Sequence, residues 1–145
     1  MRDQALAYLA AHNVMTLATQ SVWAAAVFYA SRDFTLYFVS SPQSRHALDL
    51  AREPRVAAAI HEDYRDWRAI QGIQLSGTVE RLEGAERDAA LACYRDKFDF
   101  LKSPAATLVP VLHALGKAAC YRLTPDDIYF IDNSAGFGTR THLSR

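Results

Sequence analysis

Three candidate β-strands follow one another closely between residues 14 and 40, and this spacing constrains the fold more than any other feature of the chain. The candidates, rich in β-branched and aromatic residues, are Val14–Thr19, Val22–Ala30 and Thr35–Ser40. Ser31-Arg32-Asp33 is the candidate turn before the third strand. Strands joined by short turns pair antiparallel, because a parallel pair needs a long crossover. The segment therefore predicts local antiparallel pairing and argues against a doubly wound parallel sheet.

The rest of the chain alternates helices with further strand candidates. We predict helices over the first dozen residues, Ala47–Ala51, Ala85–Leu101 and from Pro104 to Leu115, and strands at Val56–His61, Ile70–Leu82, Ala119–Leu123 and Asp127–Asp132, the last two as a pair around Thr124-Pro125-Asp126. Gly72 and Gly77 inside the longest strand indicate a bulge, a bend or the close approach of another backbone. About six strands with inserted helices predict a mainly β fold with helices (α+β), an antiparallel barrel or sheet.

Composition bounds the class of protein. The chain has 145 residues, near the usual size of one domain, and half of them are hydrophobic. The 16 basic residues balance 16 acidic ones without any basic block, so we expect neither nucleic acid nor a membrane surface as a partner. No apolar run could span a bilayer, and no export signal is recognisable. Cys93 and Cys120 form no CxxC motif, so we expect buried thiols in a protein of the reducing cytoplasm.

A Ser44-Arg45-His46 triplet follows the third strand candidate and opens a short helix that ends before a proline. The first backbone N–H groups of a helix lack intrahelical acceptors and carry a partial positive charge. Serine and arginine at that point make a candidate cradle for a phosphate. The residue types alone leave an alternative open, a solvated helix start with Ser44 or Ser41 as the N-cap.

Motifs of several other chemistries are absent from the sequence. The histidines, which show no metal-ligand spacing, are His12, His46, His61, His113 and His142. We therefore expect no metal site. There is also no Walker loop and no G-x-S-x-G nucleophile motif.

The order of these features resembles one known family. Phe38-Val39-Ser40 precedes the Ser-Arg-His triplet, and Glu53-Pro54-Arg55-Val56-Ala57 follows the short helix. This order resembles the pyridoxamine 5′-phosphate oxidase-like FMN-binding split barrels, and Ile70–Gly77 resembles the next strand of that fold. Ile128–Asn133 followed by Gly136-Phe137-Gly138 resembles the small YhbP-type branch. The resemblance covers nearly the whole chain.

The resemblance implies one FMN-binding domain over residues 1–145, a six-stranded antiparallel split β-barrel that forms a homodimer with two FMN molecules at the subunit interface. It implies that Ser44 and Arg45 contact the FMN phosphate, with His46 in place of a lysine. The strand from Ala24 to Phe28 would present its backbone to the flavin ring, because small side chains leave room there. The residues that the resemblance implies beside the ring are Ala24, Ala25, Ala26, Val39 and Ser40, and those implied from the partner subunit are Trp67, Gln71, Gln74 and Phe137.

Simpler interpretations of the residues implied from the partner stay open. Gln71 and Gln74 are also typical of an exposed strand face, and Trp67 of a packing or dimer contact. The Asp132-Asn133 to Gly138 segment is equally typical of a turn whose glycines take positive φ.

The implied function is that of a flavin-dependent oxidoreductase acting on an unknown small molecule. The alternative is a non-catalytic module of the same fold that binds or senses flavin or haem, with His142 as the candidate iron ligand. Pyridoxamine phosphate oxidase activity itself is not expected, because no basic residues are identifiable that would hold a substrate phosphate.

Overall fold

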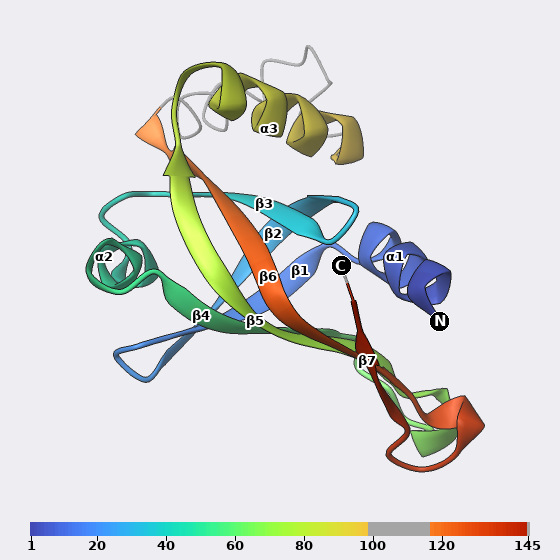
Figure 1. The fold of residues 1–145 in the computed structure, drawn as a ribbon. Helices are drawn as coiled ribbons and strands as arrows, with labels where there is room; N and C mark the ends of the chain where they lie inside the picture. Colours follow the sequence, from blue (N-terminus) through green and yellow to red (C-terminus); the bar gives the residue numbers. More distant parts are fainter. Residues whose placement is uncertain (99–116, 145) are drawn as a thin grey trace.

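The computed structural model describes residues 1–98 and 117–144 (Figure 1). The elements in chain order are α1 (Arg2–Ala11), β1 (Val14–Thr19), β2 (Trp23–Arg32), β3 (Thr35–Ser40), α2 (Arg45–Arg52), β4 (Arg55–His61), the 3-10 turn η1 (Trp67–Ala69), β5 (Gln71–Leu82), α3 (Gly84–Lys97), β6 (Ala119–Asp132), the 3-10 turn η4 (Asn133–Ala135) and β7 (Arg140–Leu143). The helix predicted from Pro104 to Leu115 lies outside the described residues. No helix in the described ranges is long and apolar enough to cross a membrane.

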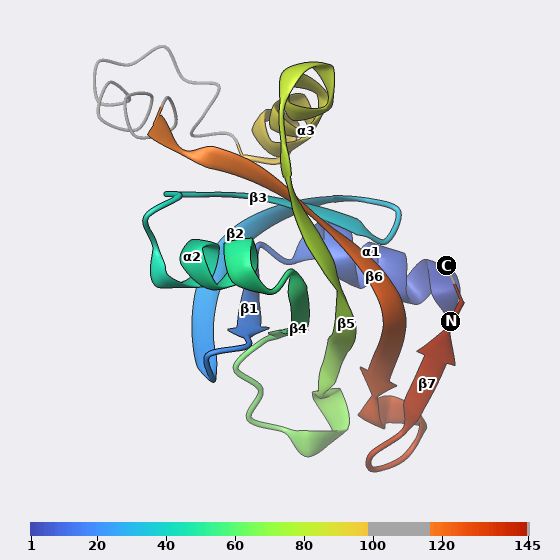
Figure 2. The same ribbon diagram turned by 60° about the vertical axis from the view of Figure 1, so that its left-hand side comes forward.

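The first six strands close into an antiparallel barrel. Their order around the sheet is β3-β2-β1-β4-β5-β6, and the first part of β6 pairs back to β3. The second part of β6 pairs with β7, which lies outside the barrel. The long strands β5 and β6 extend past the barrel toward β7 (Figures 1 and 2). The predicted six-stranded antiparallel split barrel is confirmed, and β7 is an additional strand that the sequence pattern did not indicate.

Alternate residues of each strand point inward and form the core of the barrel. Tyr29, Phe38 and Phe130 are among its largest fully buried side chains. Leu9 of α1 and Leu50 of α2 join the same cluster, and the two helices lie on opposite sides of the barrel in Figure 1. The residues between the inward positions face outward, which leaves an outer wall on which a site can form.

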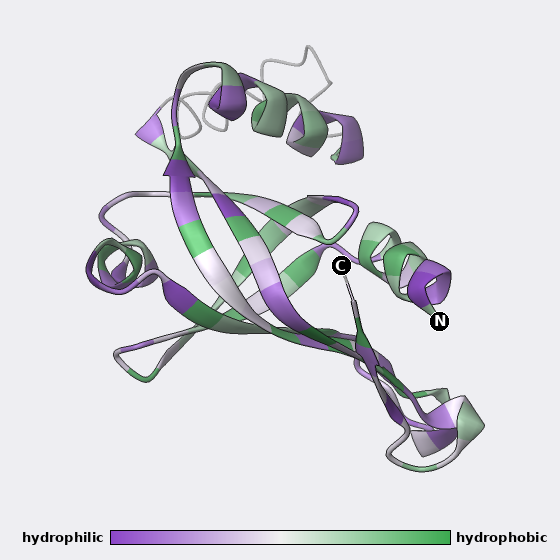
Figure 3. Ribbon diagram, in the orientation of Figure 1, coloured by the Kyte–Doolittle hydropathy of each residue, from purple (hydrophilic) through white to green (hydrophobic). Residues whose placement is uncertain are grey.

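Helix α3 packs on the outside of the barrel. Its buried residues Ala90 and Tyr94 lie on one face, as their helical spacing predicts, and Phe98 directly after the helix is buried beside them. Val39 of β3 packs against this face. Figure 3 shows hydrophobic and hydrophilic residues alternating along α3 and the strands. The helix ends at Lys97, before the predicted end at Leu101, because the backbone of Phe98 is already extended.

Both cysteines are free thiols, Cys120 buried and Cys93 half-buried. Burial raises the pKa of each thiol. They therefore pack as small apolar residues, in agreement with the expectation from the sequence.

The strand pair predicted at the C-terminal end is wrong, because β6 runs through Pro125 as one continuous strand. The pairing register shifts opposite this proline, between Ser76 and Gly77 of β5, and the shift accommodates the missing backbone N–H. A Cβ atom on Gly77 would lie 2.5 Å from the carbonyl oxygen of Thr124. The predicted bulge and close backbone approach at this glycine are therefore confirmed.

Candidate functional site

Ser44 is the N-cap residue of α2, directly before the first helical residue Arg45. Its Oγ accepts a hydrogen bond from the backbone N–H of Ala47 at 3.3 Å and lies 2.8 Å from the carbonyl oxygen of Ser41, to which it donates. Of the two candidate N-caps, Ser44 therefore takes the role. The backbone N–H groups of Arg45 and His46, in the first turn, have no acceptor within the helix.

Arg45 lies at this positive helix end, and the Ser21 hydroxyl stands between its guanidinium and the Asp49 carboxylate. Its guanidinium carbon lies 4.2 Å from the centre of the Trp23 ring, a cation–π distance, and one of its nitrogens is 3.5 Å from the Ser21 Oγ. No ion pair of Arg45 occurs among the described residues, and the first turn of α2 contains no acidic residue. Two positive features therefore lie at one point, without a direct ion pair, and the Asp49 carboxylate attracts the guanidinium through space.

His46 is a neutral group in this arrangement. Its Nε2 lies 2.8 Å from the Ser40 Oγ and 3.3 Å from the Ser44 Oγ. Burial lowers the pKa of the ring from its ordinary value, outweighing the opposite effect of the Asp49 carboxylate. The shift favours the uncharged imidazole, which contacts the two serine hydroxyls, whereas the lysine of the resembled family would add a second positive charge.

Asp49 ties the turn between β1 and β2 to α2. Its carboxylate accepts hydrogen bonds from the hydroxyls of Thr19 and Ser21, which hold the pKa of the carboxyl below its usual range. The same turn contains Val22 at φ 59, a left-handed conformation that is unusual for a β-branched residue, with its side chain 95% exposed. These contacts fix Trp23, at the start of β2, beneath Arg45.

The sequence pattern did not indicate Trp23, Asp49 or Ser21 as site residues. The available signals were weak: Asp49 follows Arg45 by one helical turn, and Trp23 directly precedes the alanine run. Their contacts join segments far apart in the sequence, so the pattern within each segment did not indicate them.

The alanine run of β2 divides between the two sides of the barrel wall. Ala24 and Ala26 are exposed on the outer side, and Ala25 points the other way. Across the sheet Ala26 pairs with Thr16, Thr16 with Ala59, and Ala59 with Gln74. We call this row of outward positions, together with the neighbouring row Ala24, Ala18 and Ala57, the small-residue wall. Apart from Gln74 at its edge, its side chains are short.

A second group of candidate residues lies where β5 and β6 extend away from α2 (Figures 1 and 2). The rings of Trp67 and Phe137 meet edge to face, with their centres 5.7 Å apart, and are 50% and 80% exposed. The Asn133 side chain joins their loops, donating to the Trp67 carbonyl at 2.9 Å and accepting from the Gly138 N–H at 3.0 Å. Gly138 has positive φ, so the turn interpretation of this segment is confirmed.

Gln71 and Gln74 line a shallow depression of about 210 Å³ near this second group, together with His61. Gln74 is exposed on the small-residue wall, whereas Gln71 is half-buried and its side chain bonds to the Asp132 carboxylate.

The structure thus brings Ser40, Ser44, Arg45 and His46 together, with Ala24 adjacent to Trp23. It places Trp67 and Phe137 in the second group, with Gln71 and Gln74 beside the neighbouring depression. The side chain of Val39 packs against α3 and is not part of the cluster around Arg45.

Comparison with known proteins agrees with this architecture. Residues 1–132 match the family described as pyridoxamine 5′-phosphate oxidase. The chain belongs to this family. It is also 30% identical over 143 residues to the UPF0306 protein YhbP of Salmonella schwarzengrund, an alignment that covers 95% of this chain and 89% of that protein. The YhbP-type branch implied by the tail sequence is therefore confirmed as well.

Two solved structures share the fold at low sequence identity. A heme binding protein from Mycobacterium smegmatis superposes with a TM-score of 0.78 at 24% identity, covering 99% of this chain and 57% of that one. An FAD-binding protein from Mesorhizobium loti superposes with a TM-score of 0.61 at 20% identity, covering 84% of this chain and 87% of that one. At these identities the likeness establishes the split barrel of the oxidase family, and the cofactor has to be argued from this chain's own residues.

Proposed function

We propose that this member of the oxidase family binds FMN, with the phosphate at the N-terminus of α2. The observation that carries the proposal is Arg45, a guanidinium held on the Trp23 ring at a positive helix end, with no carboxylate at ion-pair distance in the described part of the chain. By contrast, Arg55 and Arg122 are each paired with a carboxylate. A guanidinium without a direct ion pair at a positive helix end suits a phosphate dianion.

The donor set fits a phosphate. The first-turn N–H groups of α2 and the Arg45 guanidinium all donate, and the Ser44 hydroxyl lies beside them. His46 contributes no charge, because burial lowers its pKa. We therefore expect one charge-assisted pair with the phosphate, from Arg45, where the family resemblance implies a second one from a lysine. Phosphate binding should be correspondingly weaker.

The small-residue wall suits the flat part of the cofactor. Ala24 and Ala26 leave the backbone of β2 accessible to a ring system, and Trp23 adds an aromatic surface beside Arg45. FMN, when bound, supplies the hydride and electron chemistry, while these residues bind and orient it and exclude water.

We propose a homodimer in which the second copy completes the site. Within one chain, Trp67 and Phe137 belong to the group remote from α2, although Gln74 shares the small-residue wall with Ala26. A two-fold axis across this wall would bring the exposed aromatic pair of one copy toward the Arg45 side of the other. The short side chains and the lack of charge on the wall favour such close contact. The two free cysteines agree with a reducing compartment, the cytoplasm.

We propose that the dimer is an oxidoreductase with a small-molecule substrate. The alternative is a non-catalytic module that binds flavin or haem, which the heme binding protein of the same fold supports. His142 on β7 is its candidate ligand, although its Nε2 already lies 2.7 Å from the Asp127 carboxylate. A Soret band that appears when haemin is added and is lost in His142→Ala would favour the alternative.

The test compares FMN with riboflavin, which lacks the phosphate. Arg45→Ala removes charge-assisted hydrogen bonds worth about 1.5–3 kcal/mol, so FMN affinity should fall roughly 10- to 150-fold. Riboflavin affinity should stay unchanged, and Arg52→Ala, at the other end of α2, is the matched control. Equal FMN affinity in the wild type and Arg45→Ala would refute the phosphate site.

A further inference from the structure

A cleft lies between α1, the end of β2 and α3. Its lining elements do not include α2, where we place the phosphate site. Its volume is about 320 Å³. The residues that line it include Ala10 of α1, Ser31 and Arg32 of β2, and Cys93, Asp96 and Lys97 of α3. None of the residues assigned to the proposed FMN site lines this cleft.

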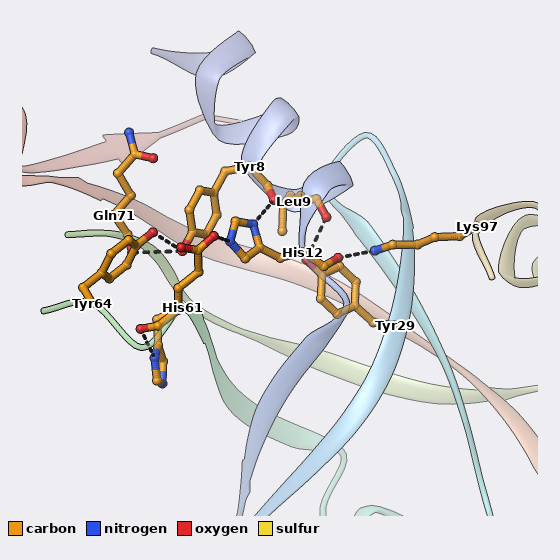
Figure 4. Close-up of polar contacts among 9 residues, drawn as sticks. Tyr8, Leu9, His12, Tyr29, His61, Tyr64, Gln71 and Lys97 are labelled. Carbon is orange, nitrogen blue, oxygen red and sulfur yellow. Dashed lines mark hydrogen bonds and ion pairs between the residues drawn. The ribbon is translucent and has the colours of Figure 1, made fainter. Parts of the chain in front are cut away.

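Lys97 has unusual surroundings for a lysine. Its ammonium donates to the carbonyl oxygen of His12, just past the end of α1, and lies 4.0 Å from the centre of the Tyr29 ring (Figure 4). No ion pair of Lys97 is found within residues 1–98 and 117–144. Half-buried between a carbonyl, an aromatic face and the cleft, the amine lacks the hydration that normally favours its charged form.

Burial accordingly lowers the pKa of Lys97 to about 8. About a fifth of such an amine is neutral at pH 7.4, compared with roughly one part in a thousand for an ordinary lysine. The described groups around it are Asp96 and Cys93 on α3, Arg32 and Tyr29 on β2, the Phe98 ring and the His12 carbonyl after α1. A neutral lysine amine that borders a cleft is a nucleophile.

Cys93 does not compete for this role. Its Sγ lies 3.7 Å from the Ser31 carbonyl oxygen, to which the thiol donates, and burial raises its pKa. The thiol therefore stays protonated, and the thiolate is the reactive form of cysteine.

Arg32 indicates which electrophile the cleft would admit. Its side chain lines the cleft together with that of Lys97. A small electrophile with an anionic leaving group could therefore place that group on the guanidinium and its reactive carbon toward the amine.

We propose that Lys97 is an acylation site that reacts with small acyl phosphates bound in this cleft. The Nζ lone pair attacks the carbonyl carbon and forms the C–N bond. The bond from that carbon to the bridging phosphate oxygen breaks, phosphate leaves with the electron pair, and the extra proton on Nζ passes to water. Acylation removes the positive charge from the Tyr29 ring and from the end of α1, where a cation is stabilising, and so weakens the link between α1 and α3.

The chain has three lysines, which gives the test an internal control. The intact protein is incubated with acetyl phosphate at pH 7.5, and acetylation of each lysine is followed over time by peptide mass spectrometry. Because its neutral fraction is larger, although its access is reduced, Lys97 should react on the order of tenfold faster than the exposed Lys117. Equal rates at these two lysines, or a faster rate at Lys117, would overturn the proposal.

Arg32→Gln tests the anion-binding part with two donors. Acetyl phosphate carries the anionic group, whereas the N-hydroxysuccinimide ester of acetic acid is neutral. The variant should slow acetylation of Lys97 by acetyl phosphate several-fold more than acetylation by the ester, while the rates at Lys117 stay unchanged. If both donors slow by the same factor, acyl phosphate recognition by Arg32 is refuted. Failure of FMN binding would not affect either result, so the two proposals are tested separately.

Discussion

The contact between Arg45 and Trp23 provides a quantitative test of how the phosphate site is organised. The guanidinium carbon lies 4.2 Å from the ring centre, and Trp23 is 43% exposed. A cation–π contact at such an exposed site contributes about 0.5–1 kcal/mol. If its role is to hold Arg45 ready for the phosphate, Trp23→Ala should weaken FMN binding by roughly 2- to 5-fold.

A double-mutant cycle separates this role from direct contact with the cofactor. FMN and riboflavin affinities are measured by fluorescence titration for the wild type, Trp23→Ala, Arg45→Ala and the double variant. In the Arg45→Ala background, Trp23→Ala should change FMN affinity by less than about 2-fold, because the residue it positions is gone. Additive effects, or an equal loss of riboflavin affinity, would refute the positioning role and indicate that Trp23 touches the flavin ring.

Three further expectations concern single residues. His46→Lys should tighten FMN binding several-fold without changing riboflavin binding, because it replaces a neutral imidazole with a cation; unchanged FMN affinity would contradict this. Tyr29→Phe removes the hydroxyl that donates to the Leu9 carbonyl at 2.7 Å, so urea unfolding should show a loss of about 1–3 kcal/mol. Hydrogen bonds from Ser134 and Gln71 hold the pKa of Asp132 below its usual range, so the stability it contributes is complete above about pH 4 and is lost as pH falls through the lower folded-state pKa. Asp132→Asn should therefore lose less stability than the wild type between pH 5 and about 2.5 in urea unfolding, and parallel curves would contradict that.

Much of the barrel could be predicted because its strands carry local signals. The strands at Val14–Thr19 and Thr35–Ser40 match β1 and β3, and the Ser44 N-cap is where the residue types placed it. In each case the deciding contacts lie within a few residues of one another, so one stretch of sequence contains the whole signal.

The errors arose where a distant segment decides the local structure. Pro125 indicated a break between two strands, but the register shift at Gly77 of β5 lets β6 continue through it. The last strand, β7, is short and exists because the edge of β6 beside it is free to pair.

The candidate site shows the same limit. Ser44 and Arg45 were identified from their own neighbourhood, whereas the support from Trp23 and Asp49 depends on the β1–β2 turn meeting α2 in three dimensions. The lowered pKa of His46 likewise could not be predicted from the sequence, because it follows from burial of the ring beside Ser40 in the folded chain.

The most direct test of the account is a crystal structure of the protein grown with saturating FMN. We expect the phosphate within hydrogen-bond distance of the Arg45 guanidinium and the first backbone N–H groups of α2, and the ring against the outer side of β2 at Ala24 and Ala26. FMN bound with its phosphate elsewhere, or no FMN bound at saturation, would contradict the central claim.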